Sequence, residues 1–115
     1  MKMITAIIKP LKFSDVKSAL EDFGIKGMTV IGVRGFGAQG GHTEIFRGAE
    51  YKIELIEKIK LEICVKADQV EKVIEIILEN ARSGPNGEIG DGKIFVKNIE
   101  EVLRIRTGER EEIAL

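Results

Sequence analysis

The sequence predicts an α+β domain in which two helices cover one face of an antiparallel sheet. Three observations lead to this prediction. The 115 residues are 43% hydrophobic and 32% charged, a balance typical of one globular domain. Short β-branched segments alternate with segments of helical periodicity. The order strand, helix, strand occurs twice along the chain.

The first strand–helix–strand unit occupies the N-terminal third. Met3–Lys9 is apolar and β-branched and stops at Pro10, which indicates a mostly buried strand. The next segment should be a helix, with Ser14 as its N-cap and Gly24 as its C-terminal stop. Its apolar stripe comprises Val16, Ala19, Leu20 and Phe23. Met28–Arg34 then returns to strand character.

The second unit repeats this plan. Lys58–Lys66 alternates, with Ile59, Leu61, Ile63 and Val65 on one face and Lys58, Lys60, Glu62 and Cys64 on the other. Asp68 and Glu71 are spaced as a capping box, and a helix should follow and end before Gly84. Its stripe comprises Val70, Val73, Ile74, Ile77, Leu78 and Ala81. Lys93–Lys97 is the last strand of a βαββαβ, ferredoxin-like plan. Beyond it, Glu101–Arg106 has the pattern of a short edge strand, and Thr107–Leu115 is polar and loose.

Composition excludes several classes of protein. A net charge of −1, from 18 basic and 19 acidic residues, argues against a nucleic-acid-binding surface. The single cysteine cannot form an internal disulfide, which favours a reducing compartment. The N-terminus lacks the apolar core of a signal peptide, and no apolar run approaches the roughly 20 residues of a membrane span. We therefore expect a cytoplasmic protein.

Two segments fall outside this scaffold and are candidate sites. They are the connection from about Gly35 to Glu57 and the glycine-rich segment Arg82–Lys93. The first opens with G-x-G-x-x-G at Gly35–Gly40, but no helical stripe follows, which argues against a Rossmann fingerprint; the alternative is a flexible hinge. The second contains G-x-x-x-x-G-K at Gly87–Lys93, but it continues into a strand without Ser or Thr, which excludes a Walker A loop.

The glycine-rich segment could still bind an anion. Successive backbone N–H groups in such a turn can form an anion nest, and Lys93 supplies a positive charge; an ordinary surface turn is the alternative. Arg104 and Arg106 alternate along the predicted edge strand. They are either a solvated edge or, with Lys93, a cationic trio for a triphosphate.

Catalytic and metal centres are not indicated. His42 is the only histidine and has no nucleophile near it in sequence, since Cys64 lies in a strand. Gln39, His42 and Glu44 offer at most a single metal ligand. Tyr51, the only tyrosine, is either packed against a neighbour or offered to a partner.

Four ordered motifs together are specific. GFGAQGGHTEIFRGAEY, KIKLEICV, GEIGDGKIFV and RIRTGER occur in this order, with IIKP and GIKGMTV before them, and the whole chain thereby resembles the PII family of nitrogen-regulatory signalling proteins. The resemblance implies a single domain over residues 1–115 that forms a homotrimer, with ATP or ADP in clefts between subunits and 2-oxoglutarate beside Mg-ATP. It matches a T-loop to residues 37–55, a B-loop to 83–92 and a C-terminal loop to 107–115.

The resemblance also implies roles for individual residues. The phosphates would be held by Gly90, Asp91, Gly92 and Lys93, with Arg104 and Arg106 from the neighbouring subunit. The adenine side would be lined by Ile7, Thr29, Glu62 and Cys64, and the cleft completed by Gly35, Phe36, Gly37 and Ala38. Gln39 would bind Mg²⁺ and, with Gly37, Gly41 and Lys58, 2-oxoglutarate. Tyr51 matches a tyrosine that is uridylylated or adenylylated in some members.

The implied function is regulation, not catalysis. Such a protein controls ammonium transport or nitrogen assimilation through its T-loop, contacting a membrane only through a channel partner. The chain departs from the family pattern at Ala38, Gly40 and Phe46, where Arg, Lys and Tyr are usual. Three extra residues occur around Pro85–Gly87, and Glu88 stands where lysine is frequent. The alternatives are a relative that responds to another small anion or a metal, and a slow nucleotide hydrolase.

Overall fold

A four-stranded antiparallel sheet is the centre of the molecule. The computed structural model describes residues 1–37, 43–46, 49–52 and 55–115, without the side chains of 43–46 and 49–52. The sheet contains β1 (Lys2–Ile8), β2 (Thr29–Gly35), β5 (Ile56–Val65) and β6 (Lys93–Asn98), in the order β2-β5-β1-β6. This order and the antiparallel pairing confirm the predicted βαββαβ plan.

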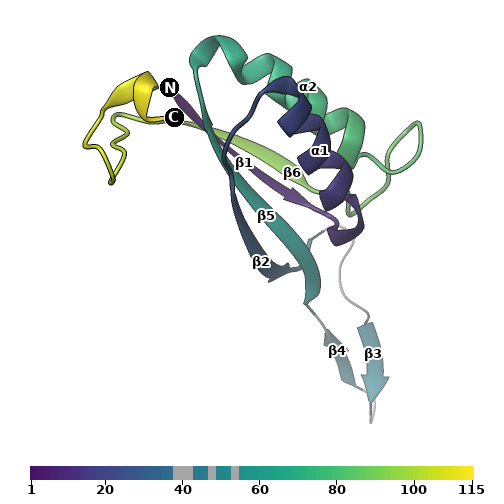
Figure 1. Cartoon of the computed structure of the whole chain (residues 1–115). Helices are drawn as coiled ribbons and strands as arrows, with labels where there is room; N and C mark the ends of the chain where they lie inside the picture. Colours follow the sequence, from purple (N-terminus) through teal and green to yellow (C-terminus); the bar gives the residue numbers. More distant parts are fainter. Residues whose placement is uncertain (38–42, 47–48, 53–54) are drawn as a thin grey trace.

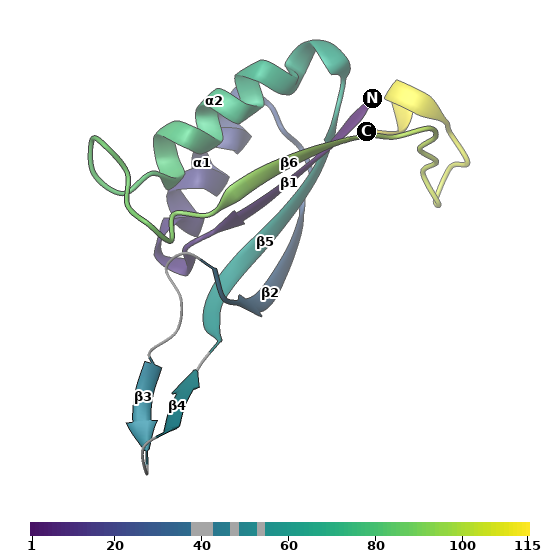
Figure 2. The same ribbon diagram turned by 180° about the vertical axis from the view of Figure 1, so that it is seen from behind.

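Both helices cover the same face of the sheet. Figures 1 and 2 show α1 (Phe13–Phe23) and α2 (Val70–Ala81) side by side on one side of the strands. Ile4 lies opposite Ile63 and Ala6 opposite Leu61, so the alternation of β1 and β5 turns the same apolar set toward the helices. The buried core comprises Ile4, Ala6, Ile8, Val16, Leu20, Leu61, Ile63, Val65, Val70, Val73, Ile76, Ile77 and Ala81.

Helix α1 begins earlier than its predicted cap. A short 3₁₀ helix, η1 (Pro10–Lys12), leads directly into it, because Pro10 is already suited to the first position of a helical turn. The prediction of Ser14 as N-cap was therefore wrong, since Ser14 lies inside the helix. The predicted stop is confirmed: Gly24 has φ 111° and its N–H donates to the Glu21 carbonyl oxygen at 3.0 Å.

Helix α2 also has an unexpected start. The 3₁₀ helix η2 (Ala67–Gln69) precedes it, and the Lys66 N–H donates to the Gln69 side-chain oxygen at 3.1 Å. The predicted Asp68–Glu71 capping box was thus wrong, because the local bond forms two residues earlier, between Lys66 and Gln69. The buried face of α2 also differs from the predicted apolar stripe: Ile76, which was not in that stripe, is buried, whereas Leu78, which was, is 43% exposed.

The C-terminal tail folds back on itself instead of joining the sheet. Leu103 forms an isolated antiparallel bridge with Arg110, across a turn at residues 105–107, and η3 (Glu111–Ala114) follows. The predicted edge strand at 101–106 was therefore wrong, since the tail's backbone groups pair within the tail. The predicted loose segment 107–115 contains this short 3₁₀ helix.

The long connection between β2 and β5 contains regular structure that the sequence did not predict. β3 (Thr43–Phe46) and β4 (Ala49–Lys52) form a two-stranded antiparallel hairpin. Figures 1 and 2 show it extending from one end of the sheet, while both chain termini lie at the other end. Among the described residues, no helix is long and apolar enough to cross a bilayer.

Candidate functional site

The turn before β6 packs directly against the end of β1. Gly90 and Gly92 have φ values of 100° and 106°, in the left-handed region that favours glycine. A Cβ atom on Gly92 would lie 1.6 Å from the carbonyl oxygen of Ile7. Glycine is therefore required at position 92 both for its backbone conformation and for the close approach of two chain segments.

A cavity of about 430 Å³ opens beside this turn. We call it the glycine-turn cavity. It joins the turn to the start of β5 and to the end of β2, so three segments that are distant in sequence meet there. Its lining residues are Ile7, Gly35, Phe36, Gly37, Ile56, Lys58, Glu88, Ile89, Gly90, Asp91, Gly92, Lys93 and Phe95.

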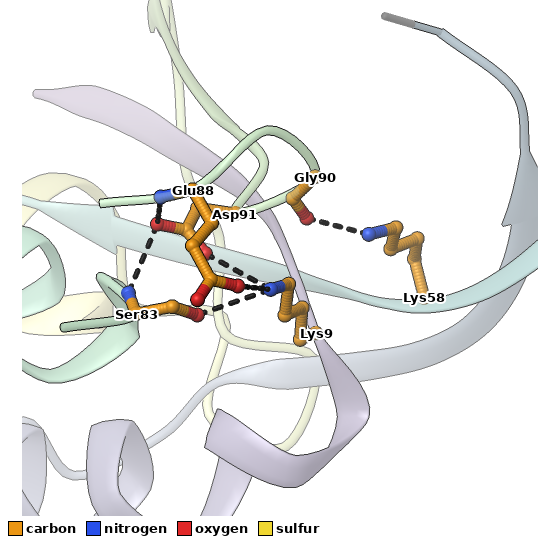
Figure 3. Close-up of polar contacts among 6 residues, drawn as sticks. All are labelled: Lys9, Lys58, Ser83, Glu88, Gly90 and Asp91. Carbon is orange, nitrogen blue, oxygen red and sulfur yellow. Dashed lines mark hydrogen bonds and ion pairs between the residues drawn. The ribbon is translucent and has the colours of Figure 1, made fainter. Parts of the chain in front are cut away.

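Two lysines line this cavity, and the two carboxylates that also line it, Glu88 and Asp91, are both paired with Lys9. The Lys58 ammonium donates a hydrogen bond to the Gly90 carbonyl oxygen at 2.5 Å (Figure 3). Burial, reinforced by the nearby Lys9 charge, lowers the pKa of Lys58 below its ordinary value. Lys93 is exposed at the start of β6. A site with lysines and a glycine-rich backbone suits the recognition of an anion.

A polar network lies behind the turn, as Figure 3 shows. The Asp91 carboxylate accepts the N–H of Ser83 at 2.9 Å and that of Glu88 at 2.8 Å, and its second oxygen lies 3.3 Å from the Lys9 ammonium. Lys9 also contacts the Ser83 hydroxyl at 3.1 Å and the Glu88 carboxylate at 3.2 Å. Burial opposes ionisation of Asp91, but the bonds from Ser83, Glu88 and Lys9 outweigh it and hold the pKa of Asp91 well below its usual range.

A second cavity, of about 510 Å³, lies beneath the C-terminal tail. We call it the tail cavity. Its lining residues include Gly27, Met28, Thr29, Glu62, Cys64, Glu112, Ala114 and Leu115. Burial raises the pKa of the Cys64 thiol, which disfavours its reactive thiolate form.

The two cavities lie at opposite ends of β5. Lys58 is near the start of the strand and Cys64 near its end, and six residues of an antiparallel strand span about 20 Å. The sequence-predicted residues therefore divide into two groups within one chain. Thr29, Glu62 and Cys64 share the tail cavity, whereas Ile7, expected with them, lies in the glycine-turn cavity.

Arg104 and Arg106 are also far from Lys93 within one chain. Lys93 begins β6, whereas both arginines follow the other end of that strand. Arg104 donates to the Glu109 carboxylate and to the Ile113 carbonyl oxygen, each at 2.8 Å. Arg106 is exposed in the turn of the tail. The cationic trio expected from the sequence is not assembled by a single copy of the chain.

Some predicted residues lie outside the described part of the chain. Ala38, Gln39 and Gly41, expected at the nucleotide, Mg²⁺ and 2-oxoglutarate sites, belong to this group. Tyr51 lies in β4, whose backbone alone is described. Within the described ranges no group of three or more His, Cys, Asp and Glu side chains could hold a metal ion.

Sequence reasoning missed the residues behind the turn. Lys9, Ser83 and the carboxylate of Glu88 meet there from three separate segments. The sequence signal was indirect: Lys9 directly follows a strand, and Ser83 and Glu88 flank the segment 84–87.

Comparison with known proteins agrees with this architecture. Residues 1–109 match the family described as "Nitrogen regulatory protein P-II". The chain is 56% identical over 115 residues to the nitrogen regulatory protein P-II of Pasteurella multocida, covering 100% of both chains. It is 49% identical over 115 residues to the nitrogen regulatory protein GlnK of Escherichia coli, again with 100% of both covered.

A solved structure shows the same fold. The crystal structure of Arabidopsis thaliana PII bound to citrate superposes with a TM-score of 0.80 and 46% sequence identity, over 99% of this chain and 91% of the other. The family match covers nearly the whole chain, the identities are far above the level at which fold alone is shared, and the relatives are named as regulatory proteins. This chain therefore belongs to the nitrogen regulatory protein P-II family.

Proposed function

We propose that this protein is a homotrimeric sensor that binds ATP or ADP and 2-oxoglutarate and regulates nitrogen assimilation or ammonium transport in the cytoplasm. Mg²⁺ would accompany ATP. The segment 37–55, which contains the β3–β4 hairpin, would contact the target protein, and Tyr51 would be a candidate for modification.

One observation supports this proposal: the residues expected at a single nucleotide lie in two separate cavities of one chain. The glycine-turn cavity holds the candidate phosphate ligands, with Gly90, Gly92 and Lys93 in one turn. The tail cavity holds the candidate adenine ligands Thr29 and Glu62. A nucleotide that contacts both groups needs two copies of the chain, because in one copy they lie at opposite ends of β5.

The uncovered face of the sheet supports self-association. Ile31 and Phe95 lie on the face opposite the helices and are 37% and 50% exposed. On the same face the Thr5 hydroxyl is buried, yet no described residue forms a hydrogen bond with it. A sheet face with exposed apolar side chains and an unsatisfied buried hydroxyl fits an interface between copies of a small domain.

The glycine-turn cavity also suits a small dicarboxylate. Lys58 projects from β5 into it, beside the end of β2 from which the segment 37–55 departs. A relative, Arabidopsis thaliana PII, has been crystallised with citrate, which is itself a polycarboxylate. Occupation of this cavity would therefore act at the base of the hairpin, where it can change the population of hairpin conformations.

Isothermal titration calorimetry tests the proposal directly. The purified protein should bind ATP and ADP, and it should bind 2-oxoglutarate only when Mg-ATP is present. Light scattering should give the mass of a trimer. Absence of nucleotide binding, or a stable monomer at micromolar concentration, would contradict the proposal.

A further inference from the structure

One carboxylate closes the loop that separates α2 from β6. Because Asp91 accepts the N–H groups of both Ser83 and Glu88, it joins the two ends of the segment 84–87. Figure 3 shows these bonds converging on the Asp91 side chain. Residues 84–86 are exposed, so this segment bulges outside the closed part of the loop.

Lys9 anchors this arrangement to the sheet. It directly follows β1, one of the two inner strands of the sheet, and its ammonium contacts Asp91, Ser83 and Glu88. The Lys9 and Asp91 side chains are only 23% and 18% exposed, whereas Glu88 is 66% exposed. The Lys9–Asp91 ion pair is thus the better shielded of the two, while Glu88 also accepts a hydrogen bond from Lys9.

We propose that Asp91, paired with Lys9, is a positioning residue that fixes the Gly90–Lys93 turn against β1. The shape of the glycine-turn cavity then does not depend on how many residues the segment 84–87 contains. An ionised carboxylate that faces Lys9 is unsuited to bind a phosphate, because like charges repel. Asp91 therefore acts through the backbone that it holds. This inference rests on the proposed function in its effect on nucleotide affinity, whereas its effect on the backbone of the turn does not depend on that function.

Two changes to the loop separate positioning from loop length. Asp91→Ala removes both N–H acceptors and the partner of Lys9. Removal of Pro85 and Asn86 shortens the exposed part of the bulge and keeps Gly87, which lies against Arg82 and Asp91. Asp91→Asn, which keeps an acceptor oxygen and loses the charge, serves as the milder variant, and Asp68→Asn on the exposed surface is the control.

ATP affinity and amide hydrogen exchange are measured on each protein. Asp91→Ala should lower the affinity for ATP about 10- to 100-fold, and the affinity of Asp91→Asn should lie between those of Asp91→Ala and the parent protein. The exchange protection of the Ser83 and Glu88 amides should be lost in Asp91→Ala while the core strands stay protected. The shortened loop should keep its ATP affinity within about threefold and retain the protected amides.

Failure of the two proposals is distinguishable. If the parent protein binds no ATP, the proposed function fails, and the exchange data alone decide the role of Asp91. The positioning role is overturned if the Ser83 and Glu88 amides exchange equally in the parent and Asp91→Ala proteins. It is also overturned if the shortened loop loses as much ATP affinity as Asp91→Ala.

Discussion

At the scale of single residues, Lys58 can exchange a backbone contact for a contact with a ligand. In this structure its ammonium is hydrogen-bonded to the Gly90 carbonyl oxygen, and partial burial lowers its pKa. An incoming carboxylate would offer it a charged acceptor instead of a neutral one, and hydrogen bonds to charged groups are the stronger kind. Lys58 is therefore suited to respond to an anionic ligand.

The first prediction concerns Lys58→Met. Methionine keeps much of the aliphatic stem and removes the charge, so the fold should persist. Loss of one charge-assisted bond, about 1.5–3 kcal/mol, should weaken 2-oxoglutarate roughly 10- to 150-fold. The affinity for ATP should fall much less, because we expect ATP to be held chiefly by the glycine-rich turn and the arginines. Titration with ATP alone, then with 2-oxoglutarate at saturating Mg-ATP, measures both.

Lys72→Met is the control for this substitution. Lys72 lies exposed on α2, away from the uncovered face of the sheet; its partner is Glu75 at 3.5 Å and it lines neither cavity. This variant should bind both ligands as the parent protein does. If the affinity for 2-oxoglutarate falls equally in the two variants, or does not fall in Lys58→Met, Lys58 does not belong to the 2-oxoglutarate site.

The second prediction concerns pH and Asp91. Its pKa is lowered in the folded protein, so its ionised form contributes stability above the unfolded-state pKa of about 4. That contribution is lost as the pH falls below about 4 toward the folded-state value. The difference in unfolding free energy between the parent and Asp91→Asn should thus be constant near neutrality and shrink in acid. Urea unfolding from pH 7 to pH 3 checks it; a constant difference throughout would contradict the assignment.

At the scale of elements, two glycines with similar φ values have different surroundings. Gly24 ends α1 with φ 111° and has no atom within 4 Å of an added Cβ, whereas at Gly92 that Cβ would meet the Ile7 carbonyl. We predict that Gly24→Ala lowers the unfolding free energy by about 1 kcal/mol. Gly92→Ala should cost more than about 3 kcal/mol, because β1 or the turn must also move. Thermal unfolding of both proteins compares them, and equal losses would mean that the turn adapts freely.

Elements whose pattern is set by burial were predictable from the sequence. The alternation of Leu61, Ile63 and Val65 gave the inward face of β5, and Gly24 gave the end of α1. Helix starts were not predictable, because 3₁₀ turns begin both helices and leave Ser14 inside α1. A choice among competing local hydrogen bonds of similar energy depends on the tertiary context.

The candidate site was predictable in composition but not in arrangement. The motifs indicated a glycine-rich anion site with Lys58 and Lys93, and these residues do line one cavity. The Lys9–Asp91 pair joins residues 82 positions apart, and no local pattern encodes such a contact. The fold-back of the tail likewise depends on Arg104 meeting Glu109, which alternation along the chain does not reveal.

At the scale of the whole molecule, the two cavities make the proposed site a property of the assembly. Lys93 belongs to the glycine-turn cavity, whereas Arg106 lies in the tail at the opposite end of the sheet. If both contact one nucleotide, they come from different copies. A copy that lacks Lys93 should then be complemented by a neighbouring copy that lacks only Arg106, because together they still supply one intact pair.

The last prediction is that mixed trimers recover binding. Lys93→Ala and Arg106→Ala homotrimers should each bind ATP weakly, since each lacks one charge at all three sites. A mixed trimer has one site with both residues intact, so an equal random mixture of the two chains should regain roughly a quarter of the sites at parental affinity. Calorimetry of the co-expressed chains measures this fraction, and a mixture of separately purified trimers is the control. No recovery in genuinely mixed trimers would mean that one copy supplies both residues.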